Sequence, residues 1–154
     1  MAAVTDRDLG WKKIKREMAR ATQLEVAVGI LEGSGSNEDG TSIAEYATYN
    51  EYGTENIPSR PFMRTAFDEN VGDIARDMEA QSNALVTGAR TARQALTIIG
   101  QKQADRIKNT ITGRDFLPKL ADSTIRAKKG STKTLVDTAA LTNAVQPSVR
   151  AKTR

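Results

Sequence analysis

The side chains that could do chemistry in this chain are carboxylates, because the chain contains neither cysteine nor histidine. That absence excludes disulfides, thiolate metal sites and every catalytic triad built on histidine. Carboxylates can hold magnesium or calcium, or act as acid and base, where they converge in a pocket. Asp73 and Asp77 lie four residues apart, as do Glu51 and Glu55. We interpret the first pair as part of a solvated helix face, and Pro58 argues against a helix through the second.

A glycine-rich segment, GSGSNEDG at residues 33–40, is the other candidate for chemistry, as a phosphate cradle. It lacks the spacing of a P-loop and its GK[ST] ending, and it does not match the dinucleotide-binding pattern. Glu38 and Asp39 within it would repel a phosphate. We therefore predict a flexible loop over residues 32–41, and a protein that is not an enzyme and uses no cofactor or metal.

Charge is distributed unevenly along the chain. Residues 1–113 carry 14 basic and 16 acidic side chains, which gives a net charge of −2. Residues 114–154 carry 9 basic and 3 acidic side chains, which gives a net charge of +6. The basic segment 113–154, which we expect to be partly extended, suggests a polyanionic neighbour, either nucleic acid or an acidic protein face. A solvated tail is the alternative. Because no helix-turn-helix, zinc-finger or RNA-recognition pattern is present, only nonspecific attraction to phosphates stays open.

The 154 residues suffice for one domain, which we predict over residues 1–154. No run of about eighteen apolar residues exists to span a membrane. The first residues lack the apolar stretch of a signal peptide, so we expect a protein made and kept in a cytoplasm.

Hydrophobic periodicity predicts an α+β chain. In the first half of the chain we expect a helix over 5–22 with an apolar stripe at Trp11, Ile14, Met18 and Ala21, a strand over 23–31, and a helix over 42–53 that carries Tyr46, Tyr49 and Tyr52. Two longer helices should follow, one from Pro61 to about residue 86 and one from about residue 92 to Gly113. The last part should form short helices over 122–129 and from 137 or 138 through Leu141, and then an edge strand over 148–150 with Pro147 just outside it. The long helix has a stripe at Met63, Phe67, Val71, Ile74 and Met78, which step by four, four, three and four residues.

Two motifs add specificity to this pattern: ATYNEYGT at residues 47–54 with IPSRPFMR at 57–64, and LVDTAAL at 135–141 with Asn143-Ala144-Val145. In the first, Glu-Tyr-Gly-Thr provides a helix end and a turn. Pro58 and Pro61 stiffen the connection, Arg60 can contact a carboxylate or helix-end carbonyls, and Phe62 can anchor the next helix. These residues either brace a corner of the fold or contact a partner directly, and bracing is the favoured interpretation. Asp137 and Thr138 are expected to cap a helix.

The two motifs, in this order and separation, resemble the phage tail-completion or head–tail joining proteins, also called minor tail components or virion-morphogenesis proteins. The resemblance spans about residues 20–147, and Ala139 stands where that family usually has glycine. The motif residues to which it points as interface or bracing positions are Tyr49, Glu51, Tyr52, Gly53, Pro58, Arg60, Pro61, Phe62, Arg64, Leu135, Asp137, Thr138 and Leu141.

The resemblance implies a small antiparallel or mixed sheet packed against long helices, and a structural subunit of the virion neck. Copies would form a sixfold ring between the head connector or stopper and the tail terminator or tube. Genome DNA would pass through the lumen without being read. Particles would be assembled in the cytoplasm of a bacterial host. The alternative is a basic, nonspecific DNA-associated assembly factor outside the mature neck. A carboxylate-dependent metal enzyme is the third hypothesis.

Overall fold

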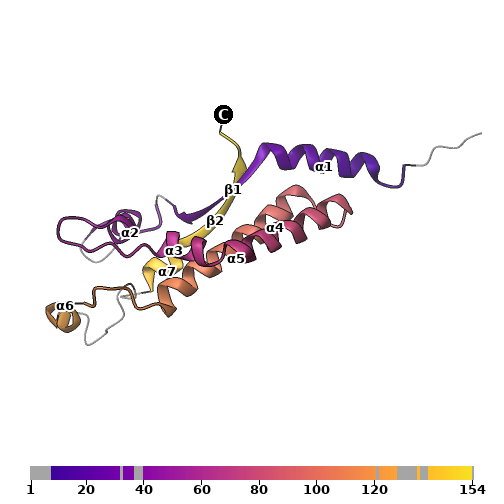
Figure 1. Cartoon of the computed structure of the whole chain (residues 1–154). Helices are drawn as coiled ribbons and strands as arrows, with labels where there is room; N and C mark the ends of the chain where they lie inside the picture. The colour runs from indigo at the N-terminus through magenta and orange to yellow at the C-terminus, as the bar shows by residue number, and fades with distance from the viewer. Residues whose placement is uncertain are drawn as a thin grey trace, which may run out of the picture.

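The computed structural model describes residues 8–31, 33–36, 40–120, 122–127, 135 and 139–153 of an elongated molecule (Figure 1). Its elements, in chain order, are α1 (Trp11–Gln23), β1 (Leu24–Ile30), α2 (Ile43–Tyr52), α3 (Phe62–Glu69), α4 (Val71–Val86), α5 (Ala92–Gly113), α6 (Asp122–Ala127), α7 (Ala140–Ala144) and β2 (Val145–Ala151). The two strands pair in an antiparallel sheet that packs on the helices. The predicted α+β class, with a small sheet against long helices, is confirmed.

The sheet joins segments from the two ends of the chain. Its register runs from Leu24 opposite Ala151 to Ile30 opposite Val145. The predicted extent of the second strand, 148–150, is wrong, because the strand covers 145–151 and Pro147 lies inside it, opposite Val28. Proline has no backbone N–H to donate, so a strand tolerates it where the N–H of that residue would point away from the partner strand. Within the described residues each strand has one neighbour, which leaves the other edge of each strand without a strand partner.

Helix α5 supports this sheet, contacting both strands as well as α3 and α4. Its closest approach is at Gly100, where an added Cβ would lie 2.6 Å from Val26 Cγ2 and 2.8 Å from Pro147 Cβ. A side chain there would force helix and sheet apart, so the glycine sets their separation. The core that results draws on α2, α3, α5, α7 and β2, and its buried members are Ile43, Ala47, Phe62, Ala66, Ala104, Ile107, Ile111, Phe116, Leu135, Leu141, Ala144 and Val145.

The single long helix predicted from residue 61 to 86 is wrong, because the chain breaks it at Asn70 into α3 and α4. Asn70 has φ −117° and ψ 13°, outside the helical range. Its side-chain amide donates to the carbonyl of Ala66 at 2.9 Å. Asparagine side chains compete in this way for backbone acceptors, which explains the interruption despite the regular apolar spacing.

The helix predicted over residues 5–22 begins at Trp11 in the structure, and residues 5–7 lie outside the described part. Gly10 precedes it with φ 111°, and the Asp8 carboxylate accepts the Gly10 N–H at 3.0 Å. Loop 32–41 falls partly outside the described residues. In the described part, Ser36 forms an isolated bridge with Ser42. None of the described helices combines the length and the apolar character needed to cross a membrane.

Candidate functional site

The first motif forms a tight corner between α2 and α3, which we call the α2–α3 corner (residues 49–64). Ser42 caps α2, because its hydroxyl accepts the Glu45 N–H at 3.1 Å. Gly53 ends the helix at φ 79°. Its ψ of 167° is extended and lies outside the left-handed helical range. A Cβ on Gly53 would lie 2.9 Å from Ser59 N and 3.1 Å from Ile57 O, so only glycine suits this turn.

Glu51 connects the two helices of the corner. Its carboxylate is buried and accepts the backbone N–H groups of Met63, at 2.9 Å, and Arg64, at 3.1 Å. These donors belong to the first turn of α3, where N–H groups have no partner within the helix. The Arg64 guanidinium also donates to the same carboxylate, at 3.0 Å from Nε, and to the Glu51 carbonyl, at 2.7 Å. Glu51 therefore caps α3 from a distance of twelve residues in the chain.

Arg60 and Phe62 anchor the inner side of the corner. The Arg60 N–H donates to the Asn50 carbonyl at 2.5 Å, and its guanidinium donates to the Asn50 side chain at 3.5 Å. Burial lowers the pKa of the Arg60 guanidinium, and its Nε finds no hydrogen-bond partner among the described residues. Phe62 is fully buried in the core. Pro61 stands at the N-cap position of α3 rather than within its first turn.

Other residues of the corner face outward. Tyr52 is 69% exposed, and the Arg64 guanidinium lies 5.2 Å from the centre of its ring. Pro58 is exposed, and Tyr49 is half-buried. The Tyr49 hydroxyl donates to the Glu45 carboxylate, which raises the pKa of the tyrosine. The corner thus has a bracing interior of Glu51, Gly53, Arg60, Pro61 and Phe62 and an outward face of Tyr49, Tyr52, Pro58 and Arg64.

The second motif joins the same core. Leu135 and Leu141 are buried in the cluster that contains Phe62. Asp137 and Thr138, the predicted caps, lie outside the described residues. The helix that follows, α7, begins at Ala140, and Ala139 precedes it with φ 59° and ψ 0°. This left-handed conformation explains why glycine would suit position 139 better than alanine.

We expect Ala139→Gly to stabilise the protein. The left-handed conformation costs alanine about 1–2 kcal/mol, and the greater flexibility of glycine in the unfolded chain offsets about half of this. The free energy of unfolding, measured by urea titration, should rise by about 0.5–1 kcal/mol. Ala140→Gly, inside α7, is the matched control and should lower it by a similar amount.

The carboxylate pairs do not form a candidate metal or acid–base site. Asp73 pairs with Arg76 in the same helix, whereas Asp77 is buried and receives Lys102 and Arg106 from α5. The interpretation of Asp77 as part of a solvated face is therefore wrong, because α5 covers it. In the described part of the chain no three carboxylates come together as metal ligands would.

Asp77 makes the fold sensitive to acid. Hydrogen bonds from Lys102 and Arg106 lower the pKa of Asp77 below its ordinary value of 3.8. A carboxylate with a lowered pKa stabilises the fold above its unfolded-state pKa and loses that contribution as pH falls through the folded-state pKa. We expect the urea midpoint of the wild type to fall below about pH 4. Asp77→Asn should show a lower midpoint at neutral pH and a smaller loss on acidification. An unchanged acid slope would contradict the assignment.

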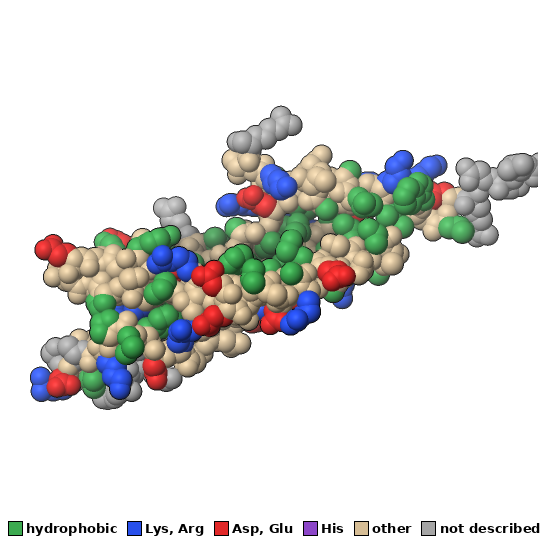
Figure 2. All heavy atoms as spheres, viewed as in Figure 1, with side chains coloured by type: hydrophobic (Ala, Val, Ile, Leu, Met, Phe, Trp, Pro, Cys, Tyr) green, Lys and Arg blue, Asp and Glu red, His purple; other side chains and the backbone are tan. Residues whose placement is uncertain are grey.

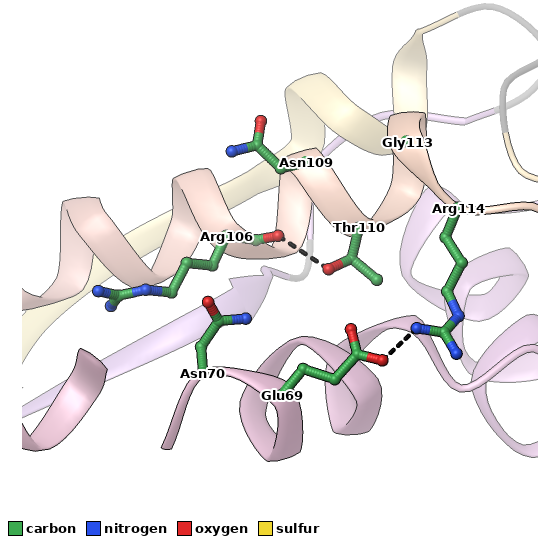
Figure 3. Close-up of a pocket in the computed structure, with 7 residues that line it drawn as sticks. All are labelled: Glu69, Asn70, Arg106, Asn109, Thr110, Gly113 and Arg114. Carbon is green, nitrogen blue, oxygen red and sulfur yellow. Dashed lines mark hydrogen bonds and ion pairs between the residues drawn. The ribbon is translucent and has the colours of Figure 1, made fainter. Parts of the chain in front are cut away.

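A shallow pocket of ≈ 270 Å³ lies between the C-terminal half of α5 and the junction of α3 and α4. Figure 3 shows the residues that line it. Arg114 donates to Glu69 across it, and the Thr110 hydroxyl donates to the Arg106 carbonyl. Its one carboxylate is already paired with a guanidinium, so the pocket does not bring an acid and a base together. Its lining residues are Glu69, Asn70, Arg106, Asn109, Thr110, Gly113 and Arg114.

The feature that sequence reasoning missed is the exposure of the predicted apolar stripe. Phe67 is 52% exposed, Val71 57% and Met78 53%, while α4 buries the polar Asp77 and Gln81. In α1, Trp11 is 63% exposed. Figure 2 shows apolar side chains gathered on the surface of the elongated body, bordered by charged ones. Periodicity alone finds such a stripe but not the side to which it points.

Comparison with known proteins adds nothing to this description, because no family model, no curated protein and no solved structure matches the chain.

Proposed function

We propose that this protein is a structural subunit of a tailed-phage neck, which joins the DNA-filled head to the tail as a ring of identical copies. The observation that carries the proposal is the apolar surface of α3 and α4. Phe67, Val71 and Met78 remain in solvent although the same helices bury charged and polar side chains. Large apolar side chains exposed in a row are typical of a surface that a protein partner covers.

The α2–α3 corner supports the same proposal. Its interior fixes the direction of α3, and its outward face presents Tyr52, Pro58 and Arg64 beside the exposed Phe67. Aromatic and arginine side chains on a rigid support are the residue types that contribute most to protein interfaces. The family resemblance of this motif, and of the motif at 135–141, supplies the head–tail joining role. The partners proposed are the connector or stopper on one side and the tail terminator or tube on the other.

The test is electron microscopy of particles from a phage strain that lacks this protein. We expect filled heads and separate tails that do not join, and we expect joining to return when the protein is supplied from a plasmid. Normal infectious virions from the deletion strain would overturn the proposal. The protein should also be found in purified wild-type virions, in the virion neck.

Nonspecific DNA association is the second candidate function, favoured by the exposed basic residues of α1. Lys12, Lys13, Lys15 and Arg16 are all exposed on this one helix. Such binding would weaken steeply with salt, because each neutralised phosphate releases counterions. Salt-sensitive DNA binding by the purified protein, together with heads and tails that join normally in the deletion strain, would favour this candidate over the neck subunit.

A further inference from the structure

Two exposed apolar surfaces of this chain carry opposite charge. The acidic helix face comprises Phe67, Val71 and Met78 with Asp68 and Glu79, on α3 and α4. The basic helix face comprises Trp11 and Met18 with Lys12, Lys15 and Arg16, on α1.

The acidic helix face results from the inverted packing of α4. This helix attaches to α5 through Asp77, which pairs with Lys102 and Arg106. The Val71 and Met78 side chains of α4 are exposed to solvent. Near these apolar residues, Asp68 and Glu79 are exposed and have no ion-pair partner among the described residues. An apolar strip bordered by unpaired carboxylates suits a partner that is apolar and basic.

The basic helix face has that composition. Glu17 is the only carboxylate of α1, and it points inward, where it accepts the Ala92 N–H at the start of α5 at 3.1 Å. Within the described part of the chain, Arg20 is the basic residue of α1 that forms an ion pair, with Glu17, and the outward side of the helix presents the basic residues Lys12, Lys15 and Arg16. Trp11 and Met18, 63% and 43% exposed, lie seven residues apart, so they share one side of the helix.

We propose that the basic helix face of one copy docks on the acidic helix face of the next copy. Apolar side chains would meet apolar side chains, and lysines and arginines would face aspartates and glutamates. A contact between two basic faces, or between two acidic faces, would instead oppose like charges. Each copy has one face of each kind, so every copy binds two neighbours through different surfaces. This head-to-tail contact is the kind that closes into a ring, and in this respect the inference rests on the proposed function.

The first measurement is the oligomeric state of the purified wild-type protein by analytical ultracentrifugation, across concentration and salt. We expect association beyond two copies that weakens as salt screens the charges. Trp11 is the only tryptophan of the chain, so its fluorescence should shift to shorter wavelength as copies associate. A protein that stays monomeric up to millimolar concentration, or that stops at dimers, would overturn the proposal.

Two variants then separate the faces. Met18→Glu damages only the basic face, and Met78→Lys damages only the acidic face. Each alone should associate at least about tenfold more weakly than wild type, because each places the wrong charge in the contact. Ala80→Lys is the matched control, since Ala80 is an exposed residue of α4 that lies two positions from Met78 and therefore on the opposite side of the helix, and it should associate like wild type.

Mixing the two variants gives the sharpest result. Met18→Glu retains an intact acidic face and Met78→Lys an intact basic face, so the mixture should form pairs with one copy of each at concentrations where neither variant alone associates. Association of either variant alone at wild-type strength, or a mixture that stays monomeric, would exclude the contact. Preserved helix content by circular dichroism would confirm that the variants fold.

The outcomes separate this contact from the neck function. If deletion of the protein leaves heads and tails unjoined but the faces fail the mixing test, the neck function stands and the contact is wrong. If the faces pass but the deletion strain makes normal virions, the contact stands and the neck function is wrong. Association that appears only with added DNA would favour the basic face as a phosphate-binding surface and overturn its role between copies.

Discussion

Phe62→Ala should lower the free energy of unfolding by about 3–5 kcal/mol, the largest effect that we expect from a single substitution in this chain. Phe62 has none of its surface exposed and packs in the core cluster with residues of α2, α5 and α7. Truncation removes the ring and leaves a cavity that the surrounding helices fill only in part. Equilibrium urea unfolding, followed by circular dichroism, measures the change.

The matched control for Phe62→Ala is Phe67→Ala. Both residues belong to α3, five positions apart, but Phe67 is 52% exposed. Its loss should change the free energy of unfolding by less than about 1 kcal/mol, because little packing is lost. Since Phe67 belongs to the acidic helix face, Phe67→Ala should nevertheless weaken association between copies. If the two substitutions destabilised the fold equally, the assignment of Phe62 to the core and Phe67 to the surface would be wrong.

The α2–α3 corner shows how much of the fold local sequence predicts. The Ser42 cap, the turn at Gly53 and the inward Phe62 all follow from residue types within about twenty positions of one another. Capping and turn chemistry are decided by neighbouring residues, so a pattern in the sequence is sufficient. The role of Glu51 as a cap for α3 was not predicted, because that hydrogen bond depends on how the connection folds back.

The packing of α4 could not be predicted in the same way. Val71, Ile74 and Met78 have the spacing of an inward stripe, yet α5 meets Asp77 on another side of the helix. The position of α4 follows from ion pairs with α5, which are tertiary contacts, and from the break at Asn70, whose local hydrogen bond to Ala66 is not evident from the apolar spacing. The Gly100 contact with the sheet also escaped prediction, although a glycine inside a 22-residue helix is a recognisable indication of close packing.

Glu51→Ala should lower the free energy of unfolding by about 2–4 kcal/mol. The substitution removes the acceptor for the Met63 and Arg64 N–H groups and leaves these donors at a part-buried helix start. It also removes the partner of the Arg64 guanidinium, which is itself half-exposed and can turn to solvent. Most of the loss should therefore come from the two backbone donors rather than from the ion pair.

Glu51→Gln tests this division. An amide oxygen can accept one of the two N–H groups but has no charge for Arg64 or for the N-terminus of α3, so the expected loss is about 1–2 kcal/mol, between wild type and Glu51→Ala. Glu55→Ala is the control, since Glu55 is an exposed carboxylate four residues further along. Equal losses for the glutamine and alanine variants would mean that charge, and not the backbone hydrogen bonds, stabilises the corner. A Glu51→Ala protein within about 0.5 kcal/mol of wild type would mean that α3 starts correctly without this cap.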